Sequence, residues 1–321
     1  MIKYSLADTP EKIVIKIGSS LLIKQNKFNS NWLSNFIDDL IFLTKKKKKI
    51  VIVASGAVSL GKKYLNIKKK KISIEMKQAC AACGQVILMR NFMNSFEKKK
   101  MKVAQILLTF SDTEDRRKSL NSRETIKSLV DLGIIPVINE NDTVATDELK
   151  FGDNDRLAAR VAQVINADLL VLLSDVDGLY DKNPKLNKDA NLIREISEIS
   201  SKTFKMATSE TNDYGSGGMF TKIQAAEIAF TFGCDTLIMK GNQKNPIKNF
   251  EKNKNGTLFK SPIKKKKVSF KNWLGGSINI SGSVKIDEGA IKALKLGASL
   301  LPSGVKKISG NFAKGDIIEI L

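Results

Sequence analysis

Residues 13–20 read Ile-Val-Ile-Lys-Ile-Gly-Ser-Ser, a short β-branched apolar run that ends in a glycine turn. A run of this kind followed by a glycine turn and a helical pattern is the unit of a parallel α/β sheet. The same alternation recurs along the chain, and it predicts strands at 13–17, 50–53, 103–108, 134–138, 169–173 and 236–239. The sequence therefore predicts a doubly wound, mostly parallel sheet sandwiched by helices, with ligands bound beyond the carboxyl ends of the strands.

The composition excludes several catalytic chemistries. The 321 residues contain no histidine, so the chain holds no Ser-His-Asp or Cys-His nucleophile, no HExxH metal site and no imidazole proton shuttle. With 42% hydrophobic and 27% charged residues, it has the composition of an ordinary globular protein with a sizeable core. Any catalysis must therefore depend on other side chains.

Basic residues outnumber acidic ones by 54 to 33, which gives a net charge of +21. Most of them are lysines gathered in runs at 45–49, 68–71, 98–100 and 264–267, with few aromatic residues beside them. Nucleic-acid surfaces usually combine arginine with aromatic stacking residues, so we interpret these runs mainly as solvated surface. Non-specific attraction to RNA remains an alternative.

The three cysteines, Cys80, Cys83 and Cys234, suit free thiols in a reducing compartment. Residues 80–83 spell a CxxC, but a zinc site needs about four ligands, and one further cysteine without histidine does not complete it. We interpret Cys80 and Cys83 as small apolar residues on an alanine-rich helix, with a redox role as the alternative. Because neither a signal peptide nor a membrane-spanning apolar run is visible, we expect a cytoplasmic protein.

Two lysines stand next to glycine turns. Lys16 interrupts the apolar strand pattern just before Gly18, where a buried ammonium is costly unless an anion meets it. The alternative is an edge strand whose lysine reaches solvent. Lys222 follows the glycine cluster 215–218 in the first turn of an expected helix, where free N–H groups favour a phosphate unless the cluster is only a flexible loop. Together the two lysines would clamp a transferring phosphoryl group.

Three polar turns follow expected strands or begin an expected helix. They are Asn139-Glu-Asn-Asp, Gly152-Asp-Asn-Asp and Ser174-Asp-Val-Asp-Gly-Leu-Tyr. Such side chains can simply cap turns. As ligands they would bind an ammonium group and hold lysines or magnesium in place, and the third turn could hold a nucleotide.

Residues 56–63, Gly-Ala-Val-Ser-Leu-Gly-Lys-Lys, nearly spell a Walker A loop. The last position lacks the Ser or Thr hydroxyl that contacts magnesium in that loop, so we set this interpretation aside. The small residues Ser55 and Gly56 instead predict a binding turn in which backbone N–H groups approach an anion closely.

Six motifs resemble the amino acid kinase superfamily in their order and spacing. They are Lys16-Ile-Gly-Ser-Ser, Ala54-Ser-Gly-Ala, Asn139-Glu-Asn-Asp, Gly152-Asp-Asn-Asp, Ser174-Asp-Val-Asp-Gly-Leu-Tyr and Ser216-Gly-Gly-Met-Phe-Thr-Lys. The resemblance covers nearly the whole chain and implies the amino acid kinase fold. The stretch 139–145 and the Gly152 turn favour the branch that acts on glutamate over those that act on aspartate, carbamate, acetylglutamate or uridylate.

The resemblance implies that the protein transfers the γ-phosphoryl group of ATP to the side-chain carboxylate of L-glutamate, the first step towards proline. Mg²⁺ would bridge ATP oxygens. Feedback inhibition by proline at the glutamate site and assembly into a homo-oligomer, a dimer or a tetramer, are further expectations. Nucleic acid and membrane are not expected partners.

The resemblance also assigns roles to residues. Lys16 and Lys222 would stabilise the transferring phosphoryl group, and Asp155 would orient both lysines. The expected glutamate-binding residues are Ser55, Gly56, Asp142 and Asn154. The expected ATP-binding residues are Lys16, Ser174, Asp175, Ser216, Gly217, Gly218, Met219, Phe220, Thr221 and Lys222. Phe220 departs from the small or hydroxylated residue usual in the family, so the packing of this loop is expected to differ.

The composition changes after about residue 260, and the C-terminal part is rich in glycines and in short segments that are strand candidates. Its motifs at 287–290, 299–302 and 310–316 resemble the start of a PUA domain that ends early, and a partial barrel of this kind must rearrange or pack on the kinase part. We predict a kinase domain at 1–260, a linker at 261–274 and a truncated PUA-like domain at 275–321. Two other functions stay open: an RNA-binding protein derived from this fold, and a sister kinase for another carboxylate.

Overall fold

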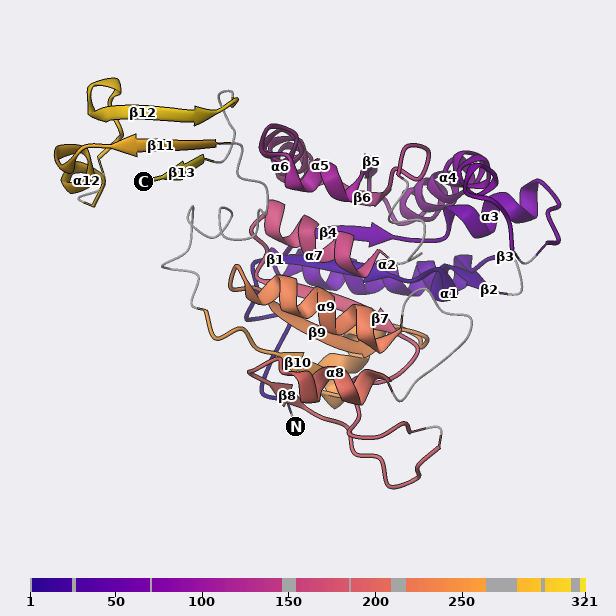
Figure 1. Ribbon diagram of the computed structural model, residues 1–321. Helices are drawn as coiled ribbons and strands as arrows, with labels where there is room; N and C mark the ends of the chain where they lie inside the picture. Colours follow the sequence, from indigo (N-terminus) through magenta and orange to yellow (C-terminus); the bar gives the residue numbers. More distant parts are fainter. Residues whose placement is uncertain are drawn as a thin grey trace.

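A computed structural model describes residues 2–24, 27–69, 71–145, 154–184, 186–208, 218–263, 282–295, 298–312 and 318–321. Its main feature is an eight-stranded sheet with the strand order β5-β6-β4-β1-β7-β9-β10-β8 (Figure 1). These strands are β1 (Lys12–Ile17), β4 (Lys49–Ala54), β5 (Val103–Leu108), β6 (Ile135–Glu140), β7 (Leu169–Ser174), β8 (Glu195–Ile196), β9 (Asp235–Lys240) and β10 (Thr257–Phe259).

The six predicted strands form one continuous parallel block from β5 to β9, which confirms the predicted fold class. β10 pairs antiparallel with β9, and β8 pairs parallel with β10, so the sheet is mostly parallel. β1 pairs with β4 on one side and with β7 on the other. Lys16 therefore lies on an inner strand, and the edge-strand alternative for this lysine is wrong.

Helices cover both faces of the sheet. They are α1 (Ser19–Leu22), α2 (Ser30–Lys45), α3 (Ala57–Tyr64), α4 (Ile74–Glu97), α5 (Phe110–Glu114), α6 (Arg116–Asp131), α7 (Asp155–Val164), α8 (Ser201–Thr208), α9 (Met219–Phe230) and α10 (Pro246–Asn253). The short strands β2 (Ile23–Lys24) and β3 (Lys27–Phe28) pair antiparallel beside α1. Within the described ranges, no helix is both long enough and apolar enough to cross a membrane.

Alternation along β1 sends its side chains into two separate cores. Ile13, Ile15 and Ile17 pack with the apolar side of α2, α4 and α10. Val14 packs with side chains of α7 and α9, the helices drawn in front of the sheet in Figure 1. Because side chains alternate along a strand, Lys16 shares the face of Val14 and points towards α7 and α9. β1 therefore places Lys16 on the face of the sheet where α7 and α9 begin.

A close crossing of α3 and α4 explains two sequence features. A Cβ added to Gly61 would lie 1.7 Å from the carbonyl oxygen of Cys80, and one added to Gly84 would lie 1.8 Å from that of Ala57. Both glycines therefore let the two helices touch through their backbones. Cys80 is buried in this crossing and Cys83 is half-buried, and both are free thiols. The second glycine of the Walker-like stretch is thus a helix-packing residue.

The C-terminal part holds a second, three-stranded sheet with the order β12-β11-β13. Its elements are β11 (Gly282–Ile286), α12 (Glu288–Lys295), the 3₁₀ helix η3 (Pro302–Gly304), β12 (Val305–Gly310) and β13 (Ile318–Ile320). Val284 and Ile286 are its buried side chains. The small, mostly β character predicted for this region is confirmed.

Candidate active site

Three charged side chains meet at the carboxyl edge of the sheet. The Asp155 carboxylate accepts contacts from Lys16 Nζ at 2.6 Å through Oδ1 and from Lys222 Nζ at 3.0 Å through Oδ2. Thr221 Oγ1 donates a third hydrogen bond to Oδ2 at 3.1 Å. The carboxylate is fully buried, and both lysines are at least nine-tenths buried.

The positions of these residues in β1, α7 and α9 explain why the three side chains come into contact. Lys16 is the last residue but one of the inner strand β1, Asp155 is the first residue of α7, and Lys222 stands in the first turn of α9. Both helices start at the edge where the parallel strands end, so their amino termini add positive potential there. Two buried ammonium groups and the amino termini of two helices lie at this edge, an arrangement that favours an incoming anion.

Asn154, the residue before Asp155, connects this cluster to the next strand end. Its Nδ2 donates to the carbonyl oxygen of Ala54 at 2.6 Å and to Asn139 Oδ1 at 2.7 Å. Asn139 Nδ2 in turn donates to Gln85 Oε1 on α4 at 2.7 Å. This chain of amides fixes the orientation of Asn154, because both protons of its Nδ2 face protein oxygens.

Gln85 was missed by the sequence analysis. It is a buried polar residue in the middle of the otherwise apolar inner side of α4. A polar residue at a core position of a helix was the available signal, and buried polar groups of this kind are hydrogen-bonded in folded proteins.

The expected binding turn at 55–56 has the geometry of a ligand site. Gly56 has a φ of +116° and caps the start of α3, a backbone conformation that side chains rarely adopt. A Cβ here would also lie 3.0 Å from Ile23 Cδ1. Ser55 Oγ is buried and has no hydrogen-bond partner among the described residues. Since a buried hydroxyl without a partner is unfavourable, this oxygen fits a polar ligand.

Asp142 lies in the turn after β6 and is half-buried. Burial raises the pKa of its carboxyl group from the ordinary 3.8 to about 6, and desolvation is the cause. A carboxylate held away from water in this manner is ready to bind a cation such as an ammonium group.

The expected nucleotide turn follows β7, next to β1 in the sheet. Ser174 is buried and its Oγ donates to Asp175 Oδ1 at 3.3 Å. Its carbonyl oxygen accepts a hydrogen bond from the N–H of Gly241 at 2.7 Å, which brings the end of β9 to the same place. Lys240 is the register partner of Ser174 and therefore lies at the same edge of the sheet.

A small pocket of about 10 Å³ connects the nucleotide turn to the start of α9. Its lining includes Gly178, Leu179, Tyr180, Met206 and Met219. The turn that begins at Ser174 and the start of α9 therefore border the same pocket, although they are about 40 residues apart in the chain. Both were predicted to bind ATP.

The remaining predicted residues have mixed outcomes. Gly218 caps the start of α9. Phe220 is 42% exposed and its ring lies 5.3 Å from that of Phe204 on α8, so this departure from the family packs against a neighbouring helix. Ser216, Gly217 and the first two residues of the Gly152 turn, Gly152 and Asp153, lie outside the described residues. No group of three or more Cys, Asp or Glu is placed to hold a metal ion in the part of the chain that the structure describes.

Comparison with known families decides the classification. The sequence model of the amino acid kinase family matches residues 11–240. The chain belongs to the amino acid kinase family. The model of the PUA domain matches residues 282–321, in agreement with the predicted C-terminal resemblance. The domain boundaries at 260 and 275 remain a prediction.

Curated relatives narrow the classification within the family. A protein named glutamate 5-kinase from Pelagibacter ubique (strain HTCC1062) is 49% identical over 310 residues, which are 96% of this chain and 84% of the relative. Another of the same name from Agrobacterium fabrum (strain C58) is 44% identical over 311 residues, 97% of this chain and 80% of the relative.

Solved structures of the family show the same fold at low identity. UMP kinase from Bacillus anthracis superposes with a TM-score of 0.54 at 15% identity and covers 79% of this chain and 97% of its own. Carbamate kinase from Giardia lamblia, bound to AMP-PNP, gives a TM-score of 0.54 at 16% identity, over 79% of this chain and 99% of its own. At such identities the comparison concerns the fold alone.

Proposed function

We propose that this protein transfers the γ-phosphoryl group of ATP to the side-chain carboxylate of L-glutamate, which gives γ-glutamyl phosphate, the first intermediate towards proline. The observation that carries this proposal is the buried cluster of Lys16, Asp155 and Lys222, in a chain 49% identical to a glutamate 5-kinase over nearly its full length. The cluster lies where a parallel α/β sheet binds its ligands.

The acceptor explains why the chain needs no histidine. A glutamate side chain has a pKa of about 4.3, so at neutral pH its carboxylate is already a nucleophile and no general base is required. Its oxygen attacks the γ-phosphorus, the bond to the β-phosphate bridging oxygen breaks, and ADP leaves. The protein's contribution is to position the reactants and to neutralise charge on the transferring group.

Lys16 and Lys222 supply that neutralisation. Asp155 holds both ammonium groups in place before substrate arrives, so they need little rearrangement during transfer. Mg²⁺ would enter with ATP as part of the substrate and would supply further positive charge to its phosphates. The turn from Ser174 to Tyr180 and the start of α9 hold the nucleotide.

Glutamate binds at the neighbouring strand ends in this proposal. Asp142 and the Oδ1 of Asn154 face its α-ammonium group, and Ser55 Oγ donates to one of its carboxylates, while Gly56 leaves room for the ligand beside the backbone. Proline inhibition at this site, assembly into a dimer or tetramer and a cytoplasmic location complete the proposal.

One acceptor assay tests the substrate. With ATP, Mg²⁺ and hydroxylamine, which traps acyl phosphates as coloured hydroxamates, we expect turnover with L-glutamate and at least about tenfold lower kcat/KM with L-aspartate or N-acetylglutamate. A higher kcat/KM for either competitor would identify a sister kinase. No turnover with any acceptor, together with tight RNA binding that weakens steeply with salt, would favour the RNA-binding alternative.

Substitution of Asp142 tests the glutamate site. We expect Asp142→Asn to raise the glutamate KM at least about tenfold with little change in kcat, because the ammonium group loses its counter-charge in both the ground state and the transition state. The matched control is Glu227→Gln, which removes an exposed carboxylate from α9. An unchanged KM would place the glutamate site elsewhere.

The pH profile gives this test a second readout. Since the pKa of Asp142 is raised to about 6, the carboxyl takes up a proton as pH falls below that value. The glutamate KM of the parent protein should then rise by about tenfold per pH unit below 6, well above the pKa of glutamate itself. Asp142→Asn should flatten this rise between pH 8 and 5.

A further inference from the structure

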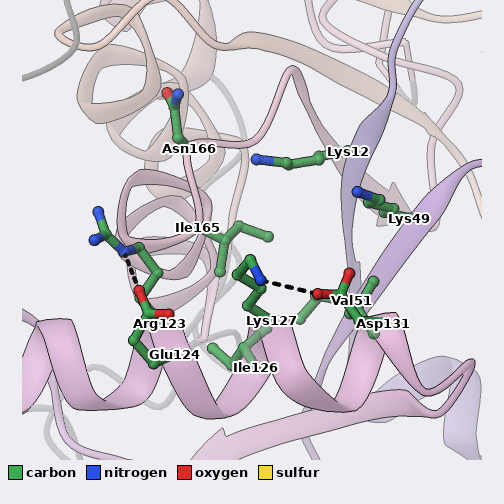
Figure 2. A pocket seen from close by; sticks show the side chains of 11 residues that line it. Lys12, Lys49, Val51, Arg123, Glu124, Ile126, Lys127, Asp131, Ile165 and Asn166 are labelled. Atoms are coloured by element: carbon green, nitrogen blue, oxygen red, sulfur yellow. Dashed lines mark hydrogen bonds and ion pairs between the residues drawn. The ribbon is translucent and has the colours of Figure 1, made fainter.

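A larger pocket lies at the opposite end of the strands from Lys16 and Asp155 (Figure 2). It has a volume of about 380 Å³ and is bordered by the amino ends of β1 and β4, by α6 and by the turn that follows α7. This volume falls in the range of small-molecule sites in proteins. Nothing in the proposed kinase reaction uses it.

Two neighbouring lysines form one side of this pocket. Lys12 and Lys49 are register partners on the adjacent parallel strands β1 and β4, and Figure 2 shows both side chains extending to the pocket from these strands. Strands of a sheet lie about 4.8 Å apart, so two like charges are held side by side, which is unfavourable without an anion nearby.

The carboxylates around the pocket leave this charge largely uncompensated. Lys49 contacts Glu11 at 3.3 Å, but both side chains are well exposed, and such pairs contribute little. Lys12 has no carboxylate within ion-pair distance among the described residues. Asp131 is already bonded to Lys127 at 3.0 Å.

At the other side of the pocket, Arg123 Nε and Glu124 Oε1 form an ion pair with each other at 3.3 Å. The pKa of Asp131 is held below its usual range, first by the hydrogen bond from Lys127 and further by Lys49 and Lys12. The positive charges of Lys12, Lys49 and Lys127 therefore all reach the Asp131 side of the pocket. With four basic and two acidic side chains in its lining, the pocket keeps an excess of positive charge.

The base of the pocket is apolar. Val51 and Ile126 are almost fully buried beneath it, and Val130 and Ile165 add half-buried aliphatic surface. A bare inorganic anion would leave this surface uncovered. A ligand with an apolar body would bury it and gain about 25 cal/mol for each Å² removed from water.

We propose that this pocket binds a small amphipathic organic anion, whose carboxylate or sulfonate group meets Lys12 and Lys49 and whose apolar body covers Val51, Ile126, Val130 and Ile165. Glutamate lacks such a body. The site is separate from the candidate active site because it lies at the amino ends of β1 and β4, whereas Lys16 lies at the carboxyl end of β1. The proposal is independent of the kinase reaction.

The probe for this test is 8-anilinonaphthalene-1-sulfonate, an aromatic sulfonate whose fluorescence rises in apolar surroundings. The full chain is titrated in the presence of saturating MgADP and glutamate, which occupy the candidate active site. We expect saturable binding with one site per chain. Lys12→Glu should weaken it at least about tenfold through charge reversal, and Val130→Phe should do the same by filling the pocket.

The control is Lys46→Glu, the same charge change on an exposed residue after α2, which should alter binding less than about twofold. Retained glutamate phosphorylation and a cooperative thermal transition show that each variant is folded. Loss of the saturable site when MgADP and glutamate are present, compared with a titration without them, or parent-like binding in both Lys12→Glu and Val130→Phe, would overturn the proposal. Displacement by millimolar inorganic phosphate, with Val130→Phe binding normally, would reduce the site to one for a bare anion and would also overturn it.

Discussion

Lys222→Ala should lower kcat for glutamate phosphorylation at least about 100-fold, and Lys16→Ala should have an effect of the same order. Each substitution removes one of the two ammonium groups that contact Asp155, so one positive charge is lost beside the transferring phosphoryl group. A 100-fold loss corresponds to about 2.7 kcal/mol of transition-state stabilisation. Steady-state kinetics with saturating ATP and glutamate measure it.

The fold should survive either substitution, because the remaining lysine and Thr221 still contact the buried carboxylate. Lys252→Ala, which removes an exposed lysine from α10, is the matched control and should leave kcat within about twofold. Near-normal turnover in Lys222→Ala or Lys16→Ala, with unchanged thermal unfolding, would remove that lysine from the catalytic role.

The sequence predicted the parallel block of the sheet well, because each of its strands is a short, mostly apolar run followed by a turn. The strands β8 and β10 were missed, since two or three residues carry no periodicity that separates a strand from a loop. Their pairing is decided by tertiary contacts, such as the hydrogen bond from the N–H of Leu179 to Thr257 Oγ1 at 2.8 Å.

Within the candidate site, the resemblance predicted that Asp155 orients Lys16 and Lys222, and the structure brings these three side chains into contact. Their catalytic roles remain a prediction. An ammonium expected to be costly inside a sheet is buried, and Asp155 supplies its counter-charge from 139 residues away in the chain. Gln85 stood out in the sequence only as a polar residue at a core position of α4, and its partner Asn139 could not be predicted, because the pairing depends on how α4 packs against the end of β6. The predicted ATP-binding residues Ser216 and Gly217 are not compared with the structure, because they lie outside the described residues.

Asp155→Asn should combine a catalytic and a stability defect. The amide keeps the shape of the side chain but removes its charge, which leaves Lys16 and Lys222 as two buried ammonium groups beside each other. Breaking a buried ion pair by removing one partner typically lowers the free energy of unfolding by about 3–5 kcal/mol. We expect a loss of this size in urea unfolding, and kcat lowered at least about 100-fold.

Sulfate distinguishes this electrostatic explanation from a loss of packing. A sulfate ion can occupy the place between the two lysines, so it should raise the melting temperature of Asp155→Asn more than that of the parent protein, compared with sodium chloride at equal ionic strength. Glu227→Gln, whose carboxylate is exposed on α9, should respond as the parent does. An equal response in all three proteins would contradict the proposed repulsion between the two ammonium groups.

The double variant Lys16→Met with Asp155→Asn gives the sharpest form of the test. If the defect of Asp155→Asn arises from repulsion between two buried ammonium groups, then removing one of them should restore part of the lost stability. The double variant should therefore unfold at a higher urea concentration than Asp155→Asn alone, although Lys16→Met by itself leaves Asp155 with one lysine fewer and should be destabilising. Additive losses would mean that the lysines and the carboxylate do not act as one charged unit, and the catalytic role given to their pairing would fail with it.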